Sequence, residues 1–226
     1  MKMRLIEIRR SILHKNDSLA AALRARFAAG GTLVVNLLSS PGSGKTTLLE
    51  QTMRRLSSGL RVAALVGDQA TENDAVRLRR SGAPVRQIET GEECRLDADM
   101  VGKALDGWDA AAIDVLFIEN VGNLICPAEY DLGEDLRVAL FSVPEGEDKP
   151  LKYPLAFNTA HLVLITKIDL AQAVGFARGA ALEAIQSVHA GVPILEVSSL
   201  SGQGFETWLE ILKDHVRRKQ GSPVAV

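Results

Sequence analysis

Residues 32–49 read TLVVNLLSSPGSGKTTLL, and this stretch decides the fold class. Its first seven residues are aliphatic apart from Thr32 and Asn36, which is typical of a strand covered on both faces of a parallel sheet. A glycine-containing turn follows and leads through Lys45 and Thr46 into an aliphatic stretch that suits the start of a helix. A strand, a glycine-rich turn, Lys-Thr and a helix in this order predict a phosphate-binding loop.

The chemistry of this turn suits a nucleoside triphosphate with Mg²⁺. Glycine allows the backbone to turn its N–H groups toward an anion, and the N-terminus of the following helix adds partial positive charge. We expect Lys45 to neutralise the β- and γ-phosphates and the Thr46 hydroxyl to ligate Mg²⁺. The strict pattern has glycine where this chain has Ser39. The residues predicted to bind phosphate are Gly42, Ser43, Gly44, Lys45, Thr46 and Thr47.

Further aliphatic runs alternate with helical patterns along the chain. The runs lie at residues 60–66, 113–118, 162–166 and 192–197, and the helical stretches at 17–29, 46–57, 72–81, 98–105, 177–189 and 206–216. This alternation predicts an α/β fold of the P-loop NTPase class, a mostly parallel sheet flanked by helices on both faces. We expect a single nucleotide-binding domain over residues 1–226, with residues 1–31 as a strand/helix extension packed on it. Ligands of such sheets bind at the carboxyl ends of the strands.

The composition argues against several classes of protein. The 226 residues are 46% hydrophobic, which is enough for a core, and the formal net charge of −2 argues against nucleic-acid binding through bulk charge. No apolar run approaches the roughly 20 residues of a membrane helix, and residues 1–10 lack the pattern of a secretory signal. The two cysteines do not make a disulfide framework. We therefore expect a cytoplasmic protein that binds neither nucleic acid nor membranes.

Two acidic residues stand at the ends of predicted strands. Asp68 follows the run at 60–66, and Glu119 ends the run at 113–118. A carboxylate at the end of a buried strand is costly unless it is paired or ligates a cation, and a Mg²⁺–phosphate site needs such groups. We expect Lys45, Asp68 and Glu119 to carry the hydrolytic chemistry, with Thr46, Asp68 or Glu119 holding Mg²⁺. Gly122 is expected to bring a backbone N–H close to the γ-phosphate.

The stretch Thr166-Lys167-Ile168-Asp169 follows the run at 162–166 and indicates the base. An Asp carboxylate accepts from the ring N1–H and exocyclic amine of guanine, and the stem of Lys167 covers the base plane. Adenine lacks that pair of donors, so we expect GTP rather than ATP. Guanine-binding proteins usually have Asn at the position of Thr166. A loop of small residues after the last strand, around Ser199, suits a backbone N–H contact with the guanine O6.

Four segments together resemble the HypB family of hydrogenase-maturation nickel GTPases, within the nickel and cobalamin accessory GTPases. They are residues 36–47 (NLLSSPGSGKTT), 67–75 (GDQATENDA), 119–127 (ENVGNLICP) and 145–154 (EGEDKPLKYP). The resemblance covers nearly the full chain, and the last two segments are the most specific. It implies a GTP-dependent homodimer that helps deliver nickel to the precursor of the hydrogenase large subunit. It also implies a small zinc-containing partner of the HypA family.

The resemblance further implies a metal site at the dimer interface, and here this sequence departs from the family. Cys94 and Cys126 match the family's two cysteines, whereas Arg95 and Asp99 stand where the family has histidines. Arginine cannot ligate a metal, so a two-fold dimer would offer four thiolates for Ni²⁺ or Zn²⁺, with Asp99 as an additional oxygen ligand. The alternative is two small buried cysteines in a chain whose metal function is lost or weakened.

We do not expect the histidines of this chain to replace the missing metal ligands. They are scattered along the chain as His14, His161, His189 and His215, and we expect surface or core roles for them. The family's Cys-rich N-terminal motif and His-rich tail are absent from this sequence, so we do not expect a nickel store. The polar segment 145–154 has two readings, an exposed connection or a mobile functional loop that carries Lys149 and Lys152.

Other functions remain as alternatives. A sister accessory GTPase could serve urease or a cobalamin enzyme, but the urease version usually has Cys-Pro-His where this chain has Ala128 after Cys126-Pro127. A scaffold that binds GTP and only dimerises is a second alternative. An ATP-dependent kinase would leave the Lys167 and Asp169 pair unexplained.

Overall fold

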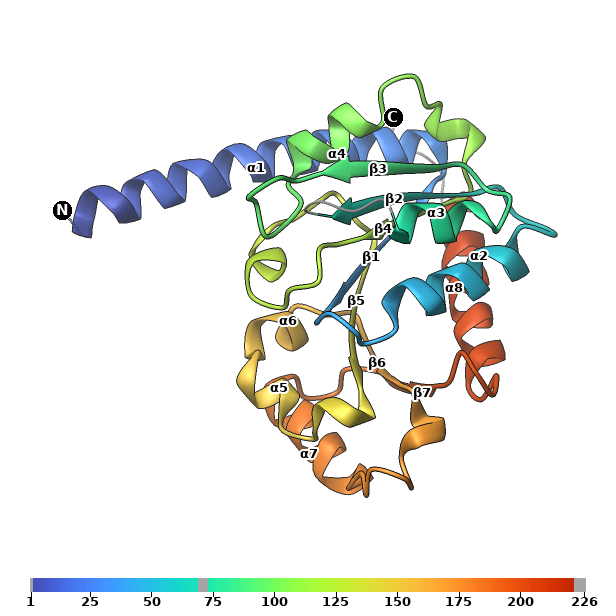
Figure 1. The fold of residues 1–226 in the computed structure, drawn as a ribbon. Helices are drawn as coiled ribbons and strands as arrows, with labels where there is room; N and C mark the ends of the chain where they lie inside the picture. The colour runs from blue at the N-terminus through green and yellow to red at the C-terminus, as the bar shows by residue number, and fades with distance from the viewer. Residues whose placement is uncertain (1, 69–72, 222–226) are drawn as a thin grey trace.

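The computed structural model describes residues 2–68 and 73–221. Its centre is a seven-stranded sheet in the order β3-β2-β4-β1-β5-β6-β7, and every neighbouring pair is parallel (Figure 1). The all-parallel sheet confirms the predicted fold class. The strands are β1 Leu33–Ser39, β2 Val62–Asp68, β3 Val85–Glu89, β4 Val115–Glu119, β5 Leu136–Ser142, β6 Leu162–Thr166 and β7 Ile194–Val197.

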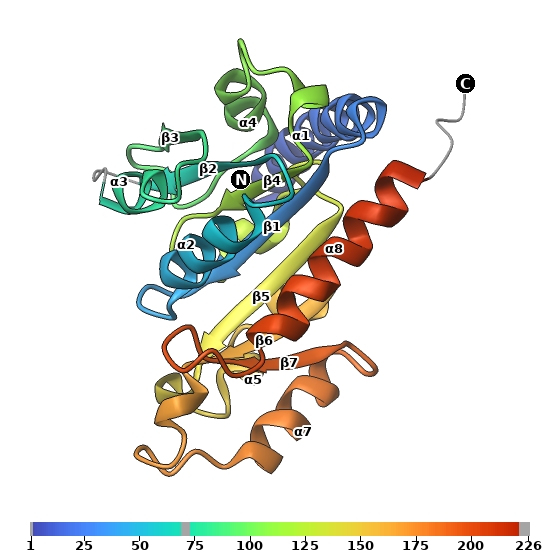
Figure 2. The ribbon, with the colours of Figure 1, turned by 90° about the vertical axis from the view of Figure 1, so that its right-hand side faces the viewer.

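Helices cover both faces of the sheet (Figure 2). The α-helices are α1 Lys2–Gly30, α2 Lys45–Leu56, α3 Asn73–Arg79, α4 Ala98–Ala104, α5 Lys149–Lys152, α6 Pro154–Asn158, α7 Arg178–Val188 and α8 Phe205–Gly221. Four short 3₁₀ helices are η1 Ala110–Ala112, η2 Cys126–Glu129, η3 Val143–Glu145 and η4 Ile168–Leu170.

Because side chains alternate along each strand, the hydrophobic core is divided between the two faces of the sheet. All seven residues of β1 are buried, and successive side chains point to opposite faces. Leu33, Val35 and Leu37 pack with α2, α3 and α8 on one face. On the opposite face, Val34 packs with α1 and α4, and Leu38 packs with α6 and α7. Burial on both faces explains why the strand reads as an almost unbroken aliphatic run.

The N-terminal segment differs from the expected strand/helix extension, because α1 is a single helix from Lys2 to Gly30. Ala20, Leu23 and Phe27 of α1 are buried in the core cluster that contains α4. Figure 1 shows the N-terminal half of α1 projecting beyond the sheet. The described part of this extension, residues 2–30, is therefore helical throughout and contains no strand.

Two strands were not predicted as such. Strand β3 lies at the edge of the sheet, and only Ile88 among its residues is buried, so it lacks an aliphatic run. Strand β5 is fully buried but is followed by a proline-containing segment that obscured the pattern. The helix expected from residue 72 begins at Asn73, and residue 72 lies outside the described residues. No described helix is long and apolar enough to cross a membrane.

Candidate functional site

The phosphate loop connects β1 to α2 at the carboxyl end of the sheet, where ligands of parallel sheets bind. Gly42 and Gly44 have φ angles of 78° and 89°, in the left-handed region that side chains disfavour. Gly44 is the N-cap of α2, so Lys45 is the first residue of the helix. The turn therefore needs glycine at both positions, and it places Lys45 and Thr46 at the positive end of α2.

Lys45, Thr46 and Glu119 meet at one carboxylate oxygen. The Thr46 hydroxyl donates to Glu119 Oε1 over 2.6 Å, and Lys45 Nζ lies 3.3 Å from the same oxygen. Glu119 ends β4 and is 1% exposed. Burial raises the pKa of Glu119, and the positive charge of Lys45 opposes that shift. The other oxygen, Oε2, is buried and has no hydrogen-bond partner within the described part of the chain.

A cleft of about 290 Å³ opens beside these groups. Because Val66 pairs with Glu119 across β2 and β4, Asp68 lies close by at the end of β2. The cleft thus gathers a lysine, a threonine hydroxyl and carboxylates, which fits phosphate and Mg²⁺. An orphaned buried carboxylate oxygen also suits a bound cation or water. The lining residues are Ser40, Pro41, Gly42, Lys45, Thr46, Gly67, Asp68, Asp74, Val121 and Gly122.

Gly122 packs directly against the phosphate loop. A Cβ atom built on Gly122 would lie 3.0 Å from Pro41 Cγ and 3.3 Å from Pro41 N. A side chain at this position would therefore push the segment after β4 away from the loop. The close approach is compatible with the predicted contact between the Gly122 backbone and a γ-phosphate.

Residues 166–169, which the sequence predicts to recognise the base, lie against the same loop. Thr166 Oγ1 donates to the carbonyl of Ser43 over 2.6 Å, and Lys167 Nζ donates to the carbonyl of Gly42 over 2.6 Å. Thr166, which replaces the usual Asn, thus ties the end of β6 to the phosphate loop. Asp169 Oδ1 accepts a hydrogen bond of 2.5 Å from the hydroxyl of Ser198.

These residues border a second pocket of about 310 Å³. Six of its eight lining residues were predicted from the sequence; Leu170 and Leu200 were not, nor was the buried Ser198 that bonds Asp169. Leu200 is 87% exposed, and no local pattern distinguishes such a leucine from an ordinary surface residue. The lining residues are Gly44, Thr47, Thr166, Lys167, Asp169, Leu170, Ser199 and Leu200.

The polar segment 145–154 is folded rather than an exposed connection, because it forms parts of η3, α5 and α6. Glu145 Oε2 accepts from the Ser43 hydroxyl and from the backbone N–H of Ser142, both over 2.7 Å. Lys149 Nζ lies 3.0 Å from Glu145 Oε1. Burial acts to raise the pKa of Glu145, but the hydrogen bonds from Ser142, Ser43 and Lys149 hold it below its ordinary value. Glu145 therefore braces the phosphate loop, a role that the sequence did not reveal.

The structure brings the two cysteine thiols together. Cys94 lies in the loop before α4 and Cys126 begins η2, and Asn123 Nδ2 donates to the carbonyl of Cys94 over 3.4 Å. A hydrogen bond with the Cys94 thiol, with burial second, raises the pKa of Cys126, while Asn123 and the charge of Arg95 act against that shift. Both cysteines are free and half-buried.

Asp99 and Arg95, which stand where the family has histidines, form contacts with other side chains. Asp99 is exposed on α4, pairs with Lys103 over 2.5 Å, and lines a groove with residues of α1. Arg95 pairs with Glu93 and stacks on Tyr130, with Cζ 4.1 Å from the ring centroid. Residues 2–68 and 73–221 contain no group of three or more His, Cys, Asp or Glu that could hold a metal ion. In one chain Asp99 does not join the two thiols in such a group, so the thiols form only part of a metal site, and a ligand role for Asp99 in a dimer stays a prediction.

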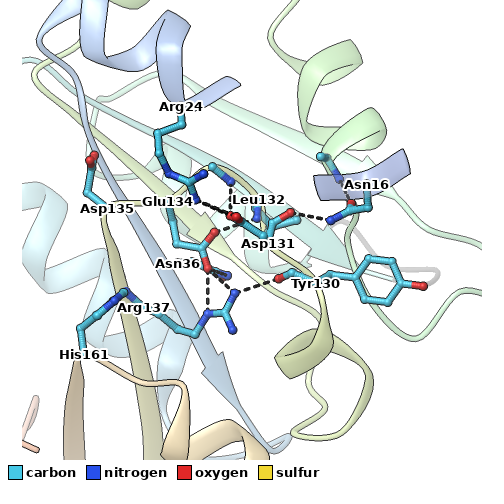
Figure 3. Close-up of polar contacts among 12 residues, drawn as sticks. Asn16, Arg24, Asn36, Tyr130, Asp131, Leu132, Glu134, Asp135, Arg137 and His161 are labelled. Carbon is cyan, nitrogen blue, oxygen red and sulfur yellow. Dashed lines mark hydrogen bonds and ion pairs between the residues drawn. The ribbon is translucent and has the colours of Figure 1, made fainter. Parts of the chain in front are cut away.

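A buried polar network holds the Cys126 segment on the sheet (Figure 3). Arg137 pairs with Glu134 over 2.6 Å and donates to the carbonyls of Ala128 and Tyr130 over 3.1 and 2.9 Å. Glu134 accepts from Asn36 Nδ2 over 3.2 Å. Asn36 lies on β1, so the network connects the strand before the phosphate loop to the residues after Cys126.

Asn120 extends this network to the Cys94 segment. Its Nδ2 donates to Asn36 Oδ1 over 3.3 Å, and its Oδ1 accepts from the backbone N–H of Leu96 over 3.2 Å. Asn120 directly follows Glu119 and is 1% exposed. The buried side-chain amide of Asn120, directly after Glu119, therefore contacts the backbone N–H of Leu96, two residues after Cys94.

Comparisons with known proteins agree with this geometry. A family model described as CobW/HypB/UreG, nucleotide-binding domain, matches residues 33–196. Hydrogenase maturation factor HypB of Escherichia coli (strain K12) is 47% identical over 210 residues, which cover 93% of this chain and 72% of that protein. The chain belongs to the HypB family.

Other HypB proteins are similar over most of their length. A protein of Helicobacter pylori (strain ATCC 700392 / 26695), named hydrogenase/urease maturation factor HypB, is 40% identical over 221 residues, 96% of this chain and 90% of that protein. The crystal structure of HypB from Archaeoglobus fulgidus is 39% identical with a TM-score of 0.84, and the match covers 90% of this chain and all of that chain.

Two further solved structures are similar to this chain to different degrees. HypB from Helicobacter pylori in complex with nickel is 38% identical with a TM-score of 0.85, over 94% of this chain and 100% of that chain. The 54 kDa signal recognition particle protein from Aeropyrum pernix, in complex with GDP, is 15% identical with a TM-score of 0.54. That match covers 84% of this chain and 49% of the other, and at this identity it shows a shared fold alone.

Proposed function

We propose that this protein binds GTP, hydrolyses it slowly and assists nickel insertion into nickel–iron hydrogenase during maturation of that enzyme. The observation that carries the proposal is the placement of Lys45, Thr46 and the buried Glu119 around one cleft, with Lys167 and Asp169 in the adjoining pocket. The first group suits the phosphates and the second suits guanine. The names of the HypB relatives support the link to hydrogenase.

Guanine recognition follows from the chemistry of the second pocket. The Asp169 carboxylate accepts from the N1–H and exocyclic amine of the base, and the Ser198 hydroxyl orients that carboxylate through its 2.5 Å hydrogen bond. Lys167 is fixed by Gly42, so its stem lies beside the base plane. A backbone N–H at Ser199 is positioned to meet the guanine O6.

Hydrolysis requires positioned water and charge stabilisation rather than covalent chemistry. In the proposed cycle, Lys45 would neutralise the β- and γ-phosphates, and Thr46 with Asp68 or Glu119 would hold Mg²⁺, which would supply positive charge at the phosphate oxygens. Glu119 and Asp68 then orient the attacking water, and the Gly122 backbone N–H contacts the γ-phosphate. We assign no arginine to the γ-phosphate, so we expect slow turnover.

Nickel is the proposed cargo, with zinc as the alternative ion. Cys94 and Cys126 supply two thiolates in each chain, so a GTP-dependent homodimer brings four together. Asn120 and the seven-residue step from Glu119 to Cys126 offer a physical connection between the γ-phosphate and the thiols. We propose a HypA-family protein and the hydrogenase large-subunit precursor as partners in the cytoplasm.

A role in urease maturation is the second candidate, because the similar Helicobacter pylori protein is named for both hydrogenase and urease. The residue after Cys126-Pro127 is Ala128 rather than the usual histidine of dedicated urease GTPases, which favours hydrogenase. A GTP-binding scaffold without turnover would release no phosphate in a single-turnover reaction.

Replacement of Lys45 tests the nucleotide site. We expect Lys45→Ala to abolish GTP hydrolysis and to weaken GTP binding strongly, because the charge beside the phosphates is lost. Phosphate release from purified protein, with GTP and then ATP as substrate, measures the effect and the base preference. Lys213→Ala is the matched control, since Lys213 lies on α8, outside the lining of both pockets, and pairs with Glu210 in an exposed ion pair. Unchanged turnover in Lys45→Ala, or equal use of ATP by the wild type, contradicts the proposal.

A further inference from the structure

Arg77 is a half-buried arginine that the proposed mechanism leaves without a role. It lies on α3, and its Nη2 is 3.0 Å from the hydroxyl of Thr47 and 3.3 Å from Glu50 Oε2. Thr47 and Glu50 belong to the first two turns of α2, immediately after the phosphate loop. The guanidinium is therefore held against the side of the helix whose N-terminus receives the phosphates.

The neighbours of Arg77 border both nucleotide pockets. Thr47, which accepts the hydrogen bond from Arg77, lines the base pocket together with Asp169. Asp74 lies one turn before Arg77 on the same face of α3, and it lines the phosphate cleft together with Lys45. Arg77 is not among the lining residues of either pocket, but its neighbours Thr47 and Asp74 place it beside both of them.

The covalent order of a nucleotide determines which of its groups would lie between the phosphate cleft and the base pocket. When the β- and γ-phosphates occupy the loop at Lys45 and guanine occupies the pocket at Asp169, the α-phosphate and ribose lie between them. A guanidinium carries a permanent charge and five N–H donors in a planar fork, which suits a phosphate oxygen. The hydrogen bonds of Arg77 to Thr47 and Glu50, among the described residues, both use one nitrogen, Nη2.

We propose that Arg77 binds the α-phosphate of the guanine nucleotide and that Thr47 and Glu50 hold its guanidinium ready for this contact. The inference rests on the proposed GTP site and adds a binding residue to it. An α-phosphate contact strengthens GTP and GDP binding alike, so Arg77 serves retention of the nucleotide through the whole cycle. An arginine that acted on the γ-phosphate would instead distinguish GTP from GDP.

The test compares Arg77→Ala and Arg77→Lys with the wild type. Affinities for a non-hydrolysable GTP analogue, GDP, GMP and guanosine are measured by competition against a fluorescent guanine nucleotide. We expect Arg77→Ala to weaken binding of the three phosphorylated ligands by a similar factor, about tenfold to a hundredfold, the effect of losing a hydrogen bond to a charged group. Guanosine binding is expected to stay unchanged, and Arg77→Lys to recover part of the loss.

Two control variants separate this role from a structural one. Arg79→Ala removes an exposed arginine from the same helix and is expected to leave every affinity unchanged. Glu50→Gln removes the ion pair but keeps Arg77, so it is expected to cause a smaller loss of affinity for the same three phosphorylated ligands. Unchanged affinities in Arg77→Ala, a loss confined to the GTP analogue, or an equal loss for guanosine would each overturn the inference. If the wild type binds none of these ligands, the proposed GTP site itself has failed.

Discussion

Thr166 shows how one residue can depart from a familiar pattern and keep its structural role. The usual asparagine at this position is absent, yet the Thr166 hydroxyl reaches the carbonyl of Ser43. Lys167, at a φ of 57°, reaches the carbonyl of Gly42. The strand that carries the base-recognition residues is therefore tied to the phosphate loop by two hydrogen bonds.

Asp169 carries the residue-scale prediction about specificity. We expect Asp169→Asn to weaken GTP binding and to raise the affinity for xanthosine triphosphate, because an amide can donate to the carbonyl of xanthine where the carboxylate accepts from guanine. Competition binding with the two nucleotides measures the change. Gln172→Ala, a nearby substitution outside the pocket lining, serves as the control. If Asp169→Asn retains the guanine preference, another group selects the base.

At the scale of elements, the ion pair of Arg137 and Glu134 fastens η2 to the sheet. Both residues are more than 90% buried, and Arg137 also donates to the carbonyls of Ala128 and Tyr130. Figure 3 shows a second ion pair nearby, between Arg24 of α1 and Asp131, which is 2.6 Å long and substantially exposed. The two pairs differ mainly in burial, so they form a matched comparison.

Loss of the buried pair should cost far more than loss of the exposed one. We expect Arg137→Ala to lower the free energy of unfolding by about 3–5 kcal/mol, because Glu134 is left as an uncompensated buried charge. Arg24→Ala should cost about 0.2–1 kcal/mol. Urea unfolding of both variants measures these values. Similar costs for the two substitutions would show that burial does not decide the strength of these pairs.

At the scale of the whole molecule, the thiol pair leads to a prediction about assembly. One chain brings Cys94 and Cys126 together, but the described residues add no third ligand. Because Ni²⁺ and Zn²⁺ sites usually need four ligands, we expect one metal ion per GTP-bound dimer. Size-exclusion chromatography with metal analysis, in GTP and in GDP, measures both the assembly and the stoichiometry.

Substitution of single residues identifies the ligands of that site. Cys126→Ser should lose most of the bound Ni²⁺ or Zn²⁺ in equilibrium dialysis, because a serine hydroxyl is a poor ligand beside a thiolate. Asp99→Ala should bind metal as the wild type does, since Asp99 pairs with Lys103. Equal metal uptake by Cys126→Ser and the wild type would remove Cys126 from the site.

Local patterns in the sequence predicted the fold class, which the structure confirms, and the positions of the expected phosphate loop and base-recognition stretch at the ends of strands. The aliphatic runs record burial on both faces of a parallel sheet, and the glycines of the loop record backbone angles that other residues avoid. The family resemblance added the expected metal site and its partners. Strand β3 was not predicted, because an edge strand with only one buried residue contains no aliphatic run.

Only the tertiary structure decided which distant side chains meet. It placed Cys94 beside Cys126, directed Asp99 toward Lys103, and set Glu145 against Ser43 across 102 positions of the chain. It also turned Arg77 toward the first turn of α2. The physical reason is that a sequence pattern records local backbone conformation and burial, whereas a hydrogen bond between remote residues depends on how the helices and loops pack around the sheet.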